Sequence, residues 1–87
     1  MSCYIISYDL RSTRDYESLY EAVKSYDTWG HILESTWAVV TSQSATEVRD
    51  YLLRHMDRDD GLFVVKSGSV AAWQGVICKS EWLKKNL

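Results

Sequence analysis

The segment CYIISYDL at residues 3–10 sets the expected fold, because it opens the chain with the alternating apolar pattern of a β-strand. It carries the carboxylate of Asp9 to the strand end, immediately before the polar residues 11–14. A carboxylate in that place can bind a metal ion, cap a helix or face water. Asp9 is therefore the best chemical clue in the sequence, and its meaning depends on the rest of the chain.

Length and charge limit what the chain can be. Its 87 residues suffice for one domain, expected to span residues 1–87. Ten Lys and Arg stand against twelve Asp and Glu, so the net charge of -2 does not by itself indicate a nucleic-acid-binding protein, although a local basic patch is compatible with it. The four Trp and six Tyr are expected to supply both core and interface.

Cysteine usage and hydropathy indicate a cytoplasmic protein. Cys3 and Cys78 form no CxxC pair and have no nearby histidine cluster, so neither a zinc site nor a disulfide framework is expected. No apolar run approaches the roughly 18 residues needed to cross a bilayer, and no export signal opens the chain. We therefore expect a soluble protein with no membrane association.

Two helices and an intervening strand are predicted in the first two thirds of the chain. Asp15 can cap a helix whose apolar face is repeated at helical spacing, and residues 31–41 are rich in β-branched and aromatic residues typical of a strand. Ser44 and Glu47 have the spacing of a capping box that opens a second amphipathic helix.

The last third predicts two strands and a short helix. Residues 62–65 form the expected third strand, residues 70–73 the fourth, and Ser80 is expected to cap a terminal helical turn. The order becomes βαββαβ if the strand at 31–41 is continued by a hairpin partner or bends into two short strands. The simplest architecture is an α+β, ferredoxin-like sandwich in which two helices cover one face of an antiparallel sheet. The other face is expected to be bare and to bind a second copy or a ligand.

Four segments carry a resemblance to a known family: YIISYDL at 4–10, HILESTWAVVT at 31–41, DRDDGLFVV at 57–65 and AAWQG at 71–75. Together they resemble the small Cas-two-like proteins of CRISPR adaptation and their VapD-like and SinR-like relatives, the last most closely, and the resemblance covers most of the chain. It implies a ferredoxin-like homodimer whose first-strand aspartates face each other across the dimer axis. In active members such a pair is thought to bind a divalent metal for phosphodiester cleavage, a role that falls here to Asp9.

This chemistry is coherent, because Mg²⁺ or Mn²⁺ held by carboxylate oxygens can activate water and neutralise a phosphate. Arg11 and Arg14 follow Asp9 and are candidates for phosphate contact, since a guanidinium matches phosphate oxygens. The competing interpretation is that Asp9 merely begins a polar loop and that both arginines are solvated there.

Other candidates are more ambiguous. The acidic turn at 57–60 does not form an EF-hand, because the twelfth position is Gly68; it is either a solvated turn or a place where Asp60 assists a metal or ligand site. If the sheet face that carries Trp37 is open, a nucleotide base can stack on Trp37 and Trp73 while the hydroxyls of Ser35 and Thr36 reach its phosphate or sugar. The favoured alternative is a dimer core built from the tryptophans.

The two histidines are the side chains that titrate near neutral pH, and the sequence gives neither a partner. A structural role is favoured for His55 at the end of the second helix, whereas His31 opens a strand and can lie near a pocket edge.

Two functions stay open. One is a metal-dependent endonuclease, with RNA the preferred substrate, that uses Asp9 from each chain and needs Mg²⁺ or Mn²⁺. The other is a non-catalytic dimer that needs no cofactor and binds a nucleotide or oligonucleotide signal, or a protein partner, in phage defence or counter-defence. The acidic charge and the lack of a general base favour the second, and the placement of Asp9 favours the first. The expectation common to both is a nucleic-acid-handling homodimer.

Overall fold

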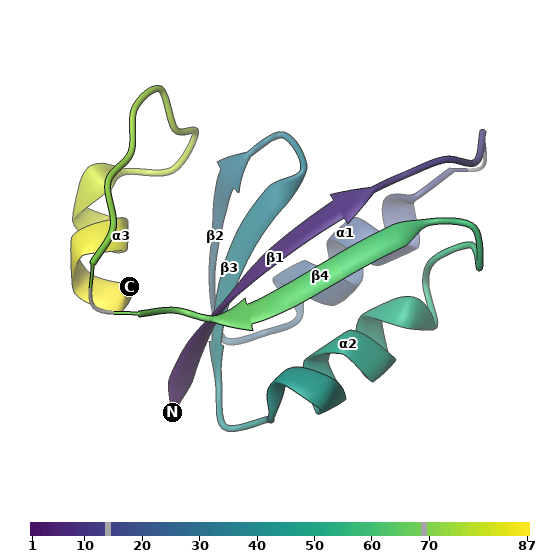
Figure 1. Cartoon of the computed structure of the whole chain (residues 1–87), viewed down its shortest axis with the longest axis horizontal. Coiled ribbons are helices and arrows are strands. Elements are labelled where there is room, and N and C mark those ends of the chain that lie inside the picture. Colours follow the sequence, from purple (N-terminus) through teal and green to yellow (C-terminus); the bar gives the residue numbers. More distant parts are fainter. Residues whose placement is uncertain (14, 69) are drawn as a thin grey trace.

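The computed structural model describes residues 1–13, 15–68 and 70–87, and within them the chain forms one four-stranded antiparallel sheet and three helices (Figure 1). The α+β class and the antiparallel sheet are confirmed. The strands are β1 (Ser2–Asp9), β2 (Thr28–Leu33), β3 (Thr36–Thr41) and β4 (Gly61–Lys66), in the spatial order β2-β3-β1-β4. The helices are α1 (Glu17–Lys24), α2 (Ala45–Leu53) and α3 (Ser80–Asn86).

The larger core lies between the sheet and helices α1 and α2, which cover the same face (Figure 1). Alternate residues of β1 point into this core, and α1 and α2 bury apolar residues at helical spacing against them. The most enclosed members are Ile6, Leu19, Val23, Val39, Val48 and Leu52.

Local signals account for where α1 and α2 begin. Ser44 accepts a hydrogen bond from the backbone N–H of Glu47, and the Glu47 carboxylate accepts one from the Ser44 N–H, so the predicted capping box is confirmed. Asp15 accepts a hydrogen bond from the N–H of Glu17 at 3.0 Å and so satisfies one free amide at the start of α1.

Residues 31–41 were predicted as a strand that either is continued by a hairpin partner or bends into two short strands, and the second alternative is confirmed. Strand β2 begins earlier, at Thr28, and a tight turn at residues 34–35 connects it to β3. The sequence contains both apolar stretches but no glycine or asparagine at residues 34–35, so composition alone does not fix the position of the turn.

The strand predicted at residues 70–73 is wrong, because the fourth strand of the described sheet is β4. β1 is already paired on both sides, with β3 and with β4, and residues 70–73 lie in the connection that leads to α3. The strand order leaves edges at β2 and β4, but residues 70–73 are paired with neither of them. The predicted cap at Ser80 is also wrong: α3 begins at that residue, and its hydroxyl accepts a hydrogen bond from the Trp73 indole at 3.2 Å.

The second sheet face is only partly bare, contrary to the expectation. The C-terminal segment and α3 pack over its β2 side, where Leu83 joins a second core cluster with Cys3, Ile32 and Ala38 (Figure 1). Trp82 lies against the backbone of Gly30 on β2. The β4 side is left uncovered, and there Phe63 is 64% exposed and Val65 is 42% exposed.

Candidate functional site

The predicted site lies at the end of β1, where Asp9 pairs in register with Gly61 of β4. The Asp9 side chain is 73% exposed, and its Oδ2 accepts a hydrogen bond from Nε of Arg11 at 3.2 Å. Arg11 also donates from Nη1 to the carbonyl of Asp59 at 2.9 Å. The structure therefore brings the two predicted residues Asp9 and Arg11 together and links them to the turn before β4.

Glycine at position 61 makes room for this arrangement. A Cβ atom there would lie 3.0 Å from Nη2 of Arg11 and 3.5 Å from Cβ of Asp9. The guanidinium thus lies directly over the first residue of β4, in space that a side chain would fill.

Asp60 stabilises the loops at the same end of the sheet through hydrogen bonds. Its Oδ1 accepts a hydrogen bond from the Arg11 N–H at 2.7 Å, its Oδ2 accepts one from the Asp57 N–H at 2.8 Å, and the Tyr16 hydroxyl lies within 2.8 Å of both oxygens. Burial tends to raise the pKa of Asp60, but the hydrogen bonds from Arg11, Tyr16 and Asp57 outweigh it and hold the pKa below its usual value. Asp60 thereby ties the loop after β1 to the turn before β4.

One copy of the chain offers too few free carboxylates at this end of the sheet to bind a metal ion. Among the described residues, no group of three or more His, Cys, Asp or Glu side chains could hold a metal ion. Asp9 offers the hard oxygen donors that Mg²⁺ and Mn²⁺ prefer, but Asp60 already accepts hydrogen bonds on both of its oxygens. The donor chemistry therefore fits a divalent ion only if another copy supplies a further carboxylate.

The remaining predicted residues do not gather at this end. Arg14 lies outside the described residues. Ser35 is exposed in the turn between β2 and β3, and Thr36 points to the sheet face opposite Trp37. Trp73 packs with the second cluster, on the face away from α1. The structure therefore separates Trp37 and Trp73 by the thickness of the sheet, and they cannot form one stacking platform.

Trp37 is a core residue of its own chain and not of a dimer interface. It is 3% exposed and belongs to the cluster under α1 and α2, where its indole N–H donates to the Tyr8 hydroxyl at 2.9 Å. Both interpretations of this residue from the sequence placed it on an open or shared face. The rings of Tyr20 on α1 and of His31 on β2 lie against its indole and cover it, which removes it from both.

A groove that the sequence analysis missed lies between α1 and the β2–β3 hairpin, with a volume of about 410 Å³. We call it the aromatic groove; its rings are those of Tyr8, Tyr20, Trp29, His31 and Trp37, and its charged residues are Glu17, Lys24 and Glu34. The spacing of Trp29 and His31, two residues apart on one strand, was the available signal, because such residues share a face.

The rings of the aromatic groove contact one another closely. His31 is stacked on Trp37 with ring centroids 3.9 Å apart and planes 8° from parallel. The centroids of Trp29 and Tyr20 lie 5.7 Å and 6.4 Å from that of Trp37. Trp37 therefore forms the floor of the groove, and Trp29, which is 38% exposed, forms one wall.

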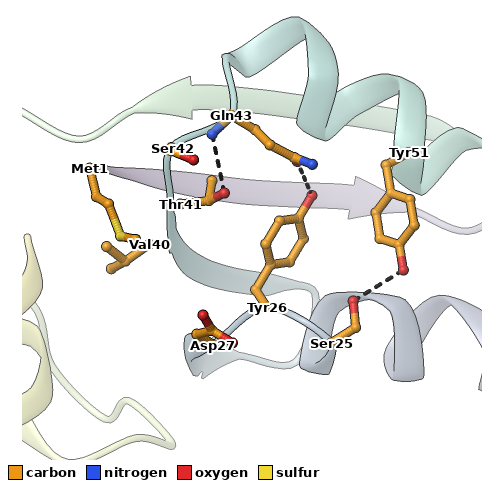
Figure 2. A pocket seen from close by; sticks show the side chains of 9 residues that line it. All are labelled: Met1, Ser25, Tyr26, Asp27, Val40, Thr41, Ser42, Gln43 and Tyr51. Atoms are coloured by element: carbon orange, nitrogen blue, oxygen red, sulfur yellow. Dashed lines mark hydrogen bonds between the residues drawn. The ribbon is translucent and has the colours of Figure 1, made fainter.

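A second hollow lies at the opposite end of the sheet and is polar (Figure 2). Figure 2 shows that its side chains bond mainly with one another: Tyr26 donates to Gln43 at 2.8 Å, and Ser25 and Tyr51 share a hydrogen bond at 3.0 Å. Burial, with the nearby Tyr51 and Glu47 adding to it, raises the pKa of Tyr26 to about 12, so the phenol stays protonated. None of the described site candidates lines this hollow.

The part of the chain that the structure describes has no helix of the length and apolarity that crossing a membrane requires.

Comparison of the sequence with protein-family models gave no match, and comparison with curated proteins gave none either. The resemblance to the Cas-two-like proteins therefore stays a prediction.

Proposed function

We propose that this chain is a ferredoxin-like, cytoplasmic homodimer that handles nucleic acid, and that Asp9 from each copy forms a metal-dependent phosphodiester-cleaving site. The order of elements, β1-α1-β2-β3-α2-β4, together with the spatial order β2-β3-β1-β4, supports the ferredoxin-like assignment, with α3 as an addition. The two cysteines, Cys3 and Cys78, are unpaired, which fits a reducing compartment.

One observation carries the proposal: Asp9 points to the same sheet face as the exposed apolar residues of β4. On β1, Ser7 is directly opposite Phe63 of β4, and Ile5 is directly opposite Val65. Because side chains alternate along a strand, Asp9 points to the same sheet face as Ile5, Ser7 and the two β4 residues. A second copy packed on this apolar surface brings its own Asp9 to the edge of the interface. Dimerisation would thus supply the second carboxylate that one chain lacks.

The two Asp9 carboxylates would hold Mg²⁺ or Mn²⁺, which supplies a more acidic bound water and charge neutralisation at phosphate. The chain itself contributes Arg11, whose guanidinium lies at Asp9 and can turn from that carboxylate to a phosphate oxygen. Asp60 contributes by holding the backbone of Arg11 in place.

Cleavage of labelled single-stranded RNA and double-stranded DNA tests catalysis, with Mg²⁺, Mn²⁺ or a chelator present. Asp9→Asn should abolish metal-dependent cleavage, whereas Asp27→Asn is the matched control. Asp27 is exposed just before β2, and the register places it about 25 Å from Asp9, at the opposite end of the sheet. Cleavage that persists in folded Asp9→Asn would overturn the assignment of the site.

The dimer has a separate test by light scattering. Phe63→Ser should shift the mass from two chains toward one, because it removes the most exposed aromatic side chain of the β4 surface. Leu53→Ser is the control, since Leu53 is 44% exposed on α2, on the side of the sheet away from that surface. A wild-type mass of one chain at micromolar concentration would refute the dimer and the paired-aspartate site with it.

A non-catalytic binding module for a nucleotide, oligonucleotide or protein is the second candidate. The specific observation in its favour is that Arg11 already pairs with Asp9 and that Asp60 is occupied by internal hydrogen bonds. Such a chain would bind without a metal cofactor. Absence of cleavage under every condition, together with a dimeric mass, would favour this function over the nuclease.

A further inference from the structure

We infer that the aromatic groove binds a guanidinium group, presented as the arginine side chain of a partner polypeptide. This inference is independent of the proposed nuclease site, because the groove opens on the α1 side of the sheet whereas Asp9 points to the other face.

The ring surfaces select for a flat or cationic ligand. Trp29 is the most exposed ring of the groove at 38%, His31 and Tyr20 are half-buried, and Trp37, on which His31 is stacked, is 3% exposed, so an entering group meets the Trp29 ring first. Aromatic ring faces attract a cation within about 6 Å of a ring centroid, and tryptophan does so most strongly. The volume of about 410 Å³ is within the range of small-ligand sites and is ample for a single side chain.

The charged residues of the groove favour one sign of charge on the ligand. Glu17 and Glu34 line it with one cation, Lys24, so its formal charge is negative. A phosphate-bearing ligand would meet two carboxylates, whereas a cation would gain from both. Charge complementarity therefore favours a positively charged group over a nucleotide at this place.

The protein's own Lys24 already occupies the cation position. Its Nζ lies 5.8 Å from the centroid of the Trp29 ring. A guanidinium is a better occupant than this ammonium, because it is planar, less strongly hydrated and able to form paired hydrogen bonds with a carboxylate while it stacks on a ring. The ligand would thus displace Lys24 from Trp29.

The backbone near Glu34 is held in place for this role. Its carbonyl accepts a hydrogen bond from the Tyr8 hydroxyl at 3.3 Å, and Nε2 of His31 lies 3.2 Å from the same oxygen. The turn that carries the carboxylate is therefore anchored to two rings of the groove. We commit to an arginine residue of a polypeptide as the source of the guanidinium; its α-amino and α-carboxyl groups lie in peptide bonds, so the guanidinium is its only charge.

Titration of the full chain with N-acetyl-L-arginine N-methylamide tests the inference, with the indole N–H signals in nuclear magnetic resonance spectra as the readout. We expect saturable shifts of the Trp29 indole signal. Glu34→Gln should weaken binding about threefold to tenfold. Glu21→Gln, which removes an exposed carboxylate from α1 outside the groove, should leave it unchanged.

Lys24→Met is the decisive variant, because it removes the competing cation and should tighten arginine binding. Lys85→Met is its control, since it removes an exposed cation from the last turn of α3. Tighter binding of adenosine monophosphate than of the capped arginine, lost in Lys24→Met, would overturn the inference. So would tighter binding of free L-arginine, or the absence of saturable shifts in the wild-type protein.

Discussion

Replacing Gly30 by alanine should destabilise the fold through one contact, between β2 and the indole of Trp82. A Cβ atom at position 30 would lie 2.9 Å from both Cε3 and Cζ3 of Trp82 and 3.1 Å from Cδ2. Because carbon atoms prefer separations of 3.5–4.0 Å, the ring would have to retreat by roughly half an ångström or more. Gly30 has no positive φ angle, so backbone strain does not contribute. Overpacking of this kind costs about 1–3 kcal/mol in the free energy of unfolding.

The displaced ring belongs to α3, so the expected damage is the loosening of that helix from the sheet. Trp82 and its neighbour Leu83 pack in the cluster that covers the β2 side of the second face. In a domain of this size, a loss of 1 kcal/mol lowers the melting temperature by about 4–8 °C. Urea unfolding followed by far-ultraviolet circular dichroism measures the cost directly.

A double-mutant cycle separates this contact from other effects of the substitution. In the Trp82→Leu background the ring atoms are gone, so Gly30→Ala should be neutral or slightly stabilising, because alanine costs less conformational entropy than glycine in a strand. The coupling energy should therefore be about 1–3 kcal/mol. An equal cost of Gly30→Ala in both backgrounds would refute the reasoning.

Three further predictions concern single residues. Ser44→Ala should lower the free energy of unfolding by about 1 kcal/mol through loss of the capping box, and Ser44→Asp should retain most of it in the same urea assay. Tyr8→Phe should cost about 1–3 kcal/mol, because it leaves the buried indole N–H of Trp37 without its acceptor; an unchanged urea midpoint would contradict this. Because the pKa of Asp60 is lowered below 3.8, its stabilising effect is present above pH 3.8 and is lost as the pH falls through the lowered value. Urea midpoints above and below pH 3.8 should therefore fall less on acidification in Asp60→Asn than in the wild type.

Helices α1 and α2 were predictable because their signals are local. The capping box of Ser44 and Glu47 and the apolar repeat of each helix lie within a few residues of the hydrogen bonds that they support. The first strand was predictable for the same reason, since alternation along residues 3–10 is itself the pattern of a half-buried surface.

For the hairpin of β2 and β3 the sequence left two alternatives open, and the absence of a strand at residues 70–73 was not predictable from local signals. The turn at residues 34–35 has none of the residues that mark a tight hairpin turn, and Val70 and its neighbours have strand-like composition without an edge of β1 to pair with. Pairing is a property of two segments, so the composition of one cannot decide it.

For the candidate site, the sequence by itself determined that a carboxylate, Asp9, stands at the end of the first strand with Arg11 just beyond it. Only the tertiary structure decided that Asp60, 49 residues after Arg11, holds the Arg11 backbone, and that Trp37 lies under α1 in the floor of the aromatic groove. The physical reason is the sequence distance over which each interaction acts. Apolar periodicity and helix caps involve residues a few positions apart. The neighbours of a side chain across a sheet are set by strand order and register, which bring distant segments together.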